Sequence, residues 1–287
     1  LVEGETRVLT LVVTAQNGVS TTTYNVAVTR ACSEDANLDG LVPSAGTLNP
    51  SFDASVVSYA TTVGNSVSAM TLTPTVASDV ASVTVEGLAV ISGAASTAVA
   101  LAEGASNTIS IVVTPQCGMS NKTYEFVVTR DPSTVATMTD VAVDMAPWGW
   151  PVSLSPTFAA GTTSYTATVA NWVPAVTVTP TATHASASST VNGVSVSSGT
   201  ASSSIDLTEN AATSIAVVIT AQDGTTTGTY TFDVTRQPSY ESTLSALVVD
   251  SGTLSGAFDQ QATSYTLAVE NSVSSLALTP TTTHSGP

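Results

Sequence analysis

Two cysteines are the residues of this sequence with the clearest chemical potential. Cys32 follows shortly after Arg30, and Cys117 lies in the turn of a predicted hairpin. If that hairpin closes a two-sheet domain, its turn lies at the end where the chain enters, next to Cys32. We therefore predict a Cys32–Cys117 disulfide; free thiols, or pairing with another chain, are the alternatives. A disulfide indicates an oxidising compartment, and two cysteines with no histidine at ligand spacing predict no zinc site.

A short acidic segment, SEDANLDG, places Asp35, Asn37 and Asp39 at the spacing that begins a calcium-binding loop. A complete EF-hand loop needs a glutamate at its twelfth position, where this chain has Gly46. The alternative is an acidic connection whose carboxylates face water. We therefore predict no metal site and no cofactor, and keep these three residues as the candidate ligands if Ca²⁺ binds.

The three tryptophans are Trp148, Trp150 and Trp172. The first two lie in a proline-flanked segment, MAPWGWP. Indole rings combine a large apolar face with a polar N–H group and are enriched where proteins meet their partners. We predict an exposed contact with a neighbouring subunit or a glycan. The alternative is packing of these rings within their own domain or against the adjacent connection.

The remaining polar residues suggest modification and turns, and we nominate no catalytic residue. Asn121 begins Asn-Lys-Thr, an acceptor sequence for N-glycosylation. His184 and His284 both follow Thr-x-Thr, and we expect turn residues there because no Ser-His-Asp arrangement accompanies them. The carboxylates are dispersed singly, so no pair can be assigned to glycoside hydrolysis.

The composition excludes several kinds of partner. The 287 residues carry a net charge of −16, which disfavours nucleic acid and anionic membrane surfaces. No run of about twenty apolar residues occurs, so we expect no membrane insertion in this segment. Valine and alanine alternate with threonine and serine, a composition typical of half-buried strands.

The elements that would position these residues repeat along the chain. The segment LTLVVTAQNGVSTTTYNVAVTR recurs twice with small changes, each time as two alternating runs around a glycine-containing turn, which predicts a β-hairpin. About seven alternating runs fill each complete copy, among them residues 69–74 in the first, as in an immunoglobulin-like β-sandwich. The second complete copy is longer by six residues, which form an insertion around Trp148 and Trp150. The predicted domains are 1–30 (the end of one repeat), 31–130 and 131–236 (complete), and 237–287 (the start of another).

The motifs of each copy are L-x-P-x-F…Y-x-x-x-V, V-x-G…S-G, L-x-x-G and T-Y-x-x-x-V-T-R. On these motifs the sequence resembles the cadherin-like β-sandwich domain found in tandem in bacterial and algal surface proteins. The resemblance implies an extracellular module of a long stalk or fibre, and it implies no catalytic residues. Two positions depart from the pattern: Asn210 replaces the glycine of L-x-x-G, and Ala159 stands where Asp53 and Asp259 stand.

The short connections, with prolines soon after two of the closing strands, favour a semi-rigid rod of tandem all-β domains. We expect a structural subunit of an extracellular filament, flagellar hair or cell-surface stalk, which contacts itself or neighbouring subunits. An adhesin or carbohydrate-binding module that uses the Trp148/Trp150 loop is the alternative. A third reading, an accessory region of an enzyme, would need a catalytic domain elsewhere.

The incomplete repeats at the two ends predict uncovered apolar faces, because half a sandwich exposes its inner side. We expect the segment to be a window cut from a longer polypeptide. A second possibility is that the head of one chain completes the tail of the next by strand addition.

Overall fold

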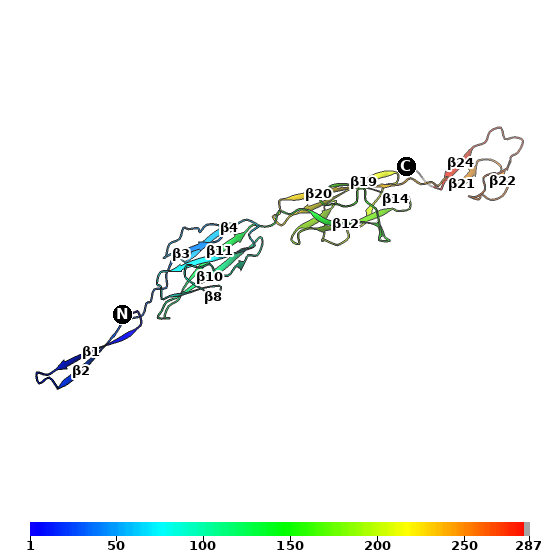
Figure 1. Ribbon diagram of the computed structural model, residues 1–287. Coiled ribbons are helices and arrows are strands. Elements are labelled where there is room, and N and C mark those ends of the chain that lie inside the picture. Colours follow the sequence, from blue (N-terminus) through cyan, green and yellow to red (C-terminus); the bar gives the residue numbers. More distant parts are fainter. Residues whose placement is uncertain (284–287) are drawn as a thin grey trace. The chain divides into compact units, whose positions relative to one another are not determined.

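The computed structural model describes residues 1–283, and this range is all-β with no helix (Figure 1). His284 lies outside the described residues. The contacts within the chain define two compact units, which are described separately. The first comprises Leu1–Val135 with Ala221–Thr226, and the second comprises Ala136–Thr220 with Thr227–Pro287.

The first unit contains the strands of the first complete repeat. One sheet has the order β4-β11-β10-β7-β8, and β3 pairs with β6 while β5 pairs with β9. All of these pairings are antiparallel except that of β4 with β11, which is parallel. The strands are β3 (Leu38–Pro43), β4 (Ser58–Val63), β5 (Ala69–Met70), β6 (Leu72–Val76), β7 (Ser82–Val85), β8 (Leu88–Val90), β9 (Val99–Ala100), β10 (Ser106–Thr114) and β11 (Lys122–Arg130).

The core of this repeat follows from the period-two pattern of its strands. In β10 and β11 every second side chain is fully buried, and the residues between them contact water or lie at the edge. The hydroxyl group of Tyr124 accepts a hydrogen bond from the Leu38 N–H group at 3.0 Å. The same hydroxyl lies 3.2 Å from the carbonyl oxygen of Ala54, to which it donates. The buried hydroxyl group of Tyr124 therefore both accepts and donates a hydrogen bond, so its polar atoms are satisfied.

The second unit repeats this plan with longer strands. One sheet has the order β14-β20-β19-β16-β17, with β14 parallel to β20, and the other has the order β13-β12-β15-β18. Tyr230 uses its hydroxyl group as Tyr124 does, accepting from the Met138 N–H group at 3.2 Å. The strands are β12 (Met138–Ala146), β13 (Trp150–Pro151), β14 (Ser164–Val169), β15 (Ala175–Ala182), β16 (Ser188–Val191), β17 (Val194–Val196), β18 (Ile205–Asp206), β19 (Ala211–Thr220) and β20 (Thr227–Arg236).

One predicted strand is divided in the first complete repeat. The alternating run over 69–74 forms β5 and β6, because the chain changes its pairing partner at Thr71. Thr71 N–H donates to Ser44 Oγ, and its carbonyl oxygen accepts from Ser44 N–H. The equivalent β15 runs unbroken and pairs with both β12 and β18.

The incomplete repeats have the predicted exposed faces. The N-terminal hairpin consists of β1 (Thr6–Thr14) and β2 (Thr21–Thr29), and its side chains are exposed along nearly its whole length. The C-terminal part forms β21 (Leu244–Val249) with β24 (Leu278–Thr282), and β22 (Thr253–Leu254) with β23 (Leu267–Ala268). The all-β, tandem-sandwich fold is thus confirmed, while the domain limits 31–130 and 131–236 stay predictions.

Replacing Phe126 or Phe232 by alanine should lower the free energy of unfolding of its repeat by about 3–5 kcal/mol, since both rings are fully buried. Val26 occupies the same position of the first hairpin and is 48% exposed, so Val26→Ala should change stability by less than about 0.5 kcal/mol. Urea unfolding followed by circular dichroism measures all three variants. Equal losses in all three would contradict the core described above.

Candidate functional site

The most unusual surface of the chain is a cluster of three indole rings in the second unit. Trp148 lies in the turn between β12 and β13, and Trp150 begins β13. This turn is closed by a hydrogen bond from Gly149 N–H to Met145 O at 2.8 Å, and Gly149 has the positive φ of 70° that glycine tolerates. Trp172 comes from the loop between β14 and β15.

The three rings pack against one another. The centroids of Trp148 and Trp150 lie 6.3 Å apart in a stacked arrangement. The Trp172 ring meets both rings edge-on, at 5.3 Å from Trp148 and 6.0 Å from Trp150. The side chains remain 46%, 56% and 52% exposed in chain order. The rings therefore pack within their own domain and also present an aromatic surface to solvent. Their contact with a neighbouring subunit or a glycan stays a prediction.

The two cysteines meet in the first unit. Cys32 and Cys117 form a disulfide with a Cα–Cα distance of 5.4 Å across 85 residues of sequence. The backbone supports this approach, because Cys117 N–H donates to Ser33 O at 3.1 Å. The thiols are thus joined within the chain, as the sequence predicts, and the bond links the entry of the repeat to its last hairpin.

The acidic segment satisfies its own polar atoms. Asp35 Oδ1 accepts hydrogen bonds from the Asn37 backbone N–H at 2.9 Å and from Asn37 Nδ2 at 2.7 Å. Asn37 Oδ1 accepts from Lys122 Nζ at 2.8 Å, so an ammonium group lies against one of the three candidate ligands. Asp39 lies exposed beyond them. Within residues 1–283 no group of three or more His, Cys, Asp and Glu side chains is arranged to hold a metal ion.

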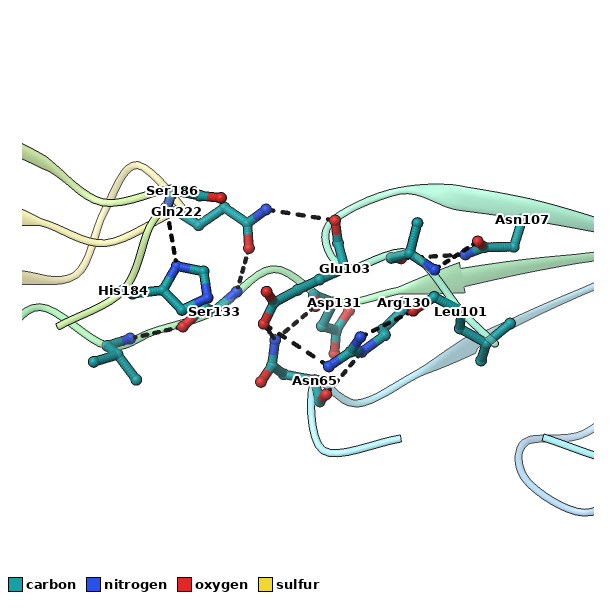
Figure 2. Close-up of polar contacts among 12 residues, drawn as sticks. Asn65, Leu101, Glu103, Asn107, Arg130, Asp131, Ser133, His184, Ser186 and Gln222 are labelled. Atoms are coloured by element: carbon teal, nitrogen blue, oxygen red, sulfur yellow. Dashed lines mark hydrogen bonds and ion pairs between the residues drawn. The ribbon is translucent and has the colours of Figure 1, made fainter. Parts of the chain in front are cut away.

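The arginine that closes the first complete repeat organises one end of its sandwich (Figure 2). Arg130 Nε donates to Asn65 O at 2.8 Å, and one of its terminal nitrogens donates to Leu101 O at 2.9 Å. Its other terminal nitrogen lies 3.9 Å from the Glu103 carboxylate, which also accepts from Asn65 Nδ2. Asn65 donates further to the carbonyl oxygen of Asp131 at 3.1 Å. One guanidinium group therefore ties together two loops and the end of β11.

The same arrangement recurs in the other copies. Arg236 Nε donates to Asn171 O at 2.7 Å, and a terminal nitrogen lies 3.3 Å from Leu207 O. Arg30 donates to Leu1 O at 3.1 Å and pairs with the Glu3 carboxylate at 2.7 Å. The closing arginines thus have a structural role that explains their presence in a chain with only five lysines and arginines.

The remaining predicted polar residues lie in turns. Asn121 is exposed just before β11, in a position open to a glycan. His184 Nδ1 accepts the Ser186 backbone N–H at 3.2 Å, which fits a residue that stabilises its own turn. The Thr226 hydroxyl and the backbone N–H groups of Thr226 and Thr225 lower the pKa of the Asp223 carboxyl to about 2. Asp223 is therefore an anionic turn residue at neutral pH.

The described surface offers hydroxyl-lined hollows. A groove of about 520 Å³ is lined by backbone and by Thr47, Asn49, Thr61, Thr62 and Thr129, with no charged side chain among its lining residues. Polar neutral walls of this kind lack the acid and base that hydrolysis needs. This groove therefore supplies no paired groups for proton transfer.

Sequence reasoning noticed the closing arginines but gave them no role. Their partners are mostly backbone carbonyl groups, which any residue type provides, so the sequence pattern around them does not reveal the contact. The available signal was the exact recurrence of Thr-Arg in a chain with few cations. The clustering of Trp172 with Trp148 and Trp150 also depended on the loop arrangement, since the sequence shows only that all three lie in one repeat.

Comparison with known families gives two consecutive matches. The sequence model of the cadherin-like beta sandwich domain matches residues 38–131 and again 138–237. A protein of Evansella cellulosilytica that is named as a membrane protein is 40% identical over 96 residues. These residues are 33% of this chain and 14% of that protein, so the chain spans a small part of this relative. No helix within residues 1–283 has the length and apolarity needed to cross a membrane.

Solved structures give distant similarities only. The protocadherin GammaB4 extracellular domain is 11% identical with a TM-score of 0.28, over 87% of this chain and 41% of that one. Domains 7, 8 and 9 of the S-layer protein SbsC are 12% identical with a TM-score of 0.19, over 82% of this chain and 72% of that one. Neither value is high enough to bear on function.

Reducing the disulfide should destabilise one repeat and spare the next. In the chain-entropy model a loop of this length is worth roughly 4 kcal/mol, whereas the positions equivalent to Cys32 and Cys117 in the second complete repeat are Pro132 and Asp223. Tryptophan fluorescence reports the second complete repeat alone, and circular dichroism reports the whole chain. Dithiothreitol should move part of the circular dichroism unfolding curve to lower urea and leave the fluorescence curve in place. A common shift of both curves, or none, would refute this.

Proposed function

We propose a function from the premise that this chain belongs to the cadherin-like beta sandwich domain family, whose model matches both of its complete repeats. We infer that the chain is a structural segment of an extracellular filament, flagellar hair or cell-surface stalk. The observation that carries this is the recurrence of one architecture, in phase: the same buried tyrosines, the same closing arginine and the same loop contacts in successive repeats. Tandem repetition of one domain increases the length of a protein, as a filament or stalk requires.

The chemistry of the surface supports an extracellular role. The Cys32–Cys117 disulfide is stable in an oxidising compartment. Only 9% of the residues are charged. Threonines occupy outward positions of the strands, as Thr229, Thr231 and Thr235 do in β20, so the surface is rich in hydroxyl groups. The name of the Evansella cellulosilytica relative agrees with a location at the cell envelope.

The proposal assigns no catalytic step to this segment. The groups with chemical potential already have structural partners: Lys122 is bonded to Asn37 and to the carbonyl oxygen of Ala54, and Asp223 caps its own turn. In this proposal the partners of the chain are neighbouring subunits of the same assembly. We expect no Ca²⁺ at Asp35, Asn37 and Asp39, and the hydrogen bonds of the first two with protein groups support this expectation.

Electron microscopy of the producing cells tests the structural role. An antibody raised against residues 31–236 should label ordered filaments or stalks outside the cell, in a regular pattern along their length. Antibody blocked with the purified segment serves as the control. Label confined to the cytoplasm, or scattered on soluble material with no ordered structure, would contradict the proposal.

The indole cluster favours a second candidate function, recognition of a carbohydrate by an adhesive module. Trp148 and Trp150 stack side by side and are about half exposed, and Trp172 supports both from the edge. The apolar C–H face of a sugar ring packs on an indole face, and its hydroxyl groups remain in water. A neutral glycan also suits a surface with net negative charge, which repels anionic ligands.

Trp148→Ala with Trp150→Ala separates the two candidates. If the cluster contacts neighbouring subunits, the double variant should impair assembly seen by electron microscopy and leave glycan binding absent before and after the change. If it binds a glycan, assembly stays normal and binding on a glycan array falls at least tenfold. Ile91→Ala is the matched control, because Ile91 is 80% exposed in the sister repeat and lies outside the cluster. Normal assembly without glycan binding in either protein would exclude both roles for these rings.

A further inference from the structure

A glutamine lies in the turn of every closing hairpin. Gln16, Gln116 and Gln222 stand in AQNG, PQCG and AQDG, at the offsets of 100 and 106 that also relate the closing arginines. These turn positions lie outside the core, so packing does not explain why all three are glutamine. The hydrogen bonds of Gln116 and Gln222 do explain it.

Gln116 connects to the end of the repeat before its own. Its Oε1 accepts the backbone N–H of Ser33 at 3.1 Å, and its Nε2 donates to the carbonyl oxygen of Glu3 at 2.9 Å. Ser33 O in turn accepts the N–H of Cys117, the residue after the glutamine. A single side-chain amide thus satisfies one donor and one acceptor of the backbone, and a backbone bond closes the arrangement. All of these residues belong to the first compact unit.

Gln222 makes the same set of contacts (Figure 2). Its Oε1 accepts the N–H of Ser133 at 2.9 Å, and its Nε2 lies 3.4 Å from the carbonyl oxygen of Glu103. Asp223 N–H donates to Ser133 O at 3.2 Å. The turn Ala221–Thr226 that carries this glutamine is grouped with Leu1–Val135 in the first compact unit. Ser133 is only 2% exposed.

A glycine makes room for each glutamine. Gly4 and Gly104 have φ angles of +76° and +62°, which favour glycine. A Cβ atom built on Gly4 would lie 3.1 Å from Gln116 Nε2, and one on Gly104 would lie 2.8 Å from Gln222 Nε2. We call the glutamate carbonyl, the glycine after it and the serine N–H together the glutamine seat. The first seat is Glu3, Gly4 and Ser33, and the second is Glu103, Gly104 and Ser133.

The third copy of the seat is built differently. Asn210 replaces the glycine and keeps a positive φ of 51°. Its Cβ atom therefore stands at the position where, in the other two seats, a Cβ atom would approach the glutamine. Ser239 N–H donates to Glu209 Oε1 at 2.7 Å, so the serine bonds to the glutamate side chain of the repeat before it. In the third seat, therefore, the serine donor bonds to a glutamate side chain, and an asparagine stands where a glycine makes room for the amide in the other two.

We propose that the glutamine seat is an interaction surface whose partner is a hairpin turn that carries glutamine, and that the third seat is closed to such a turn. The partner of the first two seats is the last hairpin of the following repeat. This inference holds whether the chain is a filament segment or an adhesin, so its failure would leave both functions as they stand.

Limited digestion with trypsin tests the proposal on the intact chain, because a cleavable arginine lies three residues before each serine of the seats: Arg30, Arg130 and Arg236. Gln116→Ala should speed cleavage after Arg30 about tenfold and leave cleavage after Arg130 unchanged, since two hydrogen bonds that oppose local opening are lost. Gln222→Ala should do the reverse. Neither variant should alter cleavage after Arg236.

Two further variants keep the test specific. Gly104→Asn copies the third seat at a backbone position that asparagine tolerates, and it should speed cleavage after Arg130 about as much as Gln222→Ala. Gln16→Ala is the control, since Gln16 contacts neither of the two seats described, and it should change no rate. Mass spectrometry of the digest measures the three bonds separately, and unchanged circular dichroism shows that each variant is folded.

Amide hydrogen exchange at the serines gives an independent readout. Gln116→Ala should speed exchange of the Ser33 N–H group about tenfold, and Gln222→Ala should do so for Ser133, each without affecting the other serine. Unchanged exchange and cleavage at the paired site would overturn the proposal. Equal acceleration at all sites would overturn it as well, because it would show general loosening of the fold.

Discussion

The structure depends on the burial of alternate side chains along each closing hairpin. Because successive residues of a strand point to opposite faces, β10 and β11 direct one set of apolar side chains inward and leave threonines outside. The same pattern in β1 and β2 leaves Tyr24 and Val26 exposed, whereas Tyr124 and Phe126 are fully buried. Alternation therefore specifies which face is apolar, and a facing sheet is needed to turn that face into a core.

Backbone polar groups at the ends of the sandwich impose the second constraint. Loops that leave a sheet carry carbonyl groups without ladder partners, and these must be satisfied when they are shielded from water. Arg130 and Arg236 each bond two such carbonyls from separate loops, and a guanidinium group can do this because its donors are fixed in one plane. These arginines are among the five cationic side chains of this acidic chain, and they bond to loop carbonyl groups. Few cationic side chains therefore remain to bind an anionic partner.

The sequence predicted the fold class and the three hairpins, because both follow from local alternation of apolar and polar residues. It also predicted the Cys32–Cys117 pair, because the turn of the last hairpin lies at the end of the domain where the chain enters. It did not reach the parallel pairing of β4 with β11 or the division of one strand at Thr71. Alternation identifies a buried face but does not say which strand lies alongside. The loop contacts of Arg130 were also beyond reach, because they join its side chain to carbonyl groups that carry no residue identity.

The repeats share their core and differ in their turns, and this limits where their functions can diverge. Substituting a buried position costs several kcal/mol, whereas a turn accepts new residues if its backbone angles are respected. The second complete repeat has two such changes: the insertion that brings Trp148 and Trp150 to Trp172, and Asn210 in place of glycine. Both changes keep the sandwich and alter what the loops present. A chain built from one repeated core can therefore change the side chains that it presents in its loops, while each sandwich keeps the same buried residues.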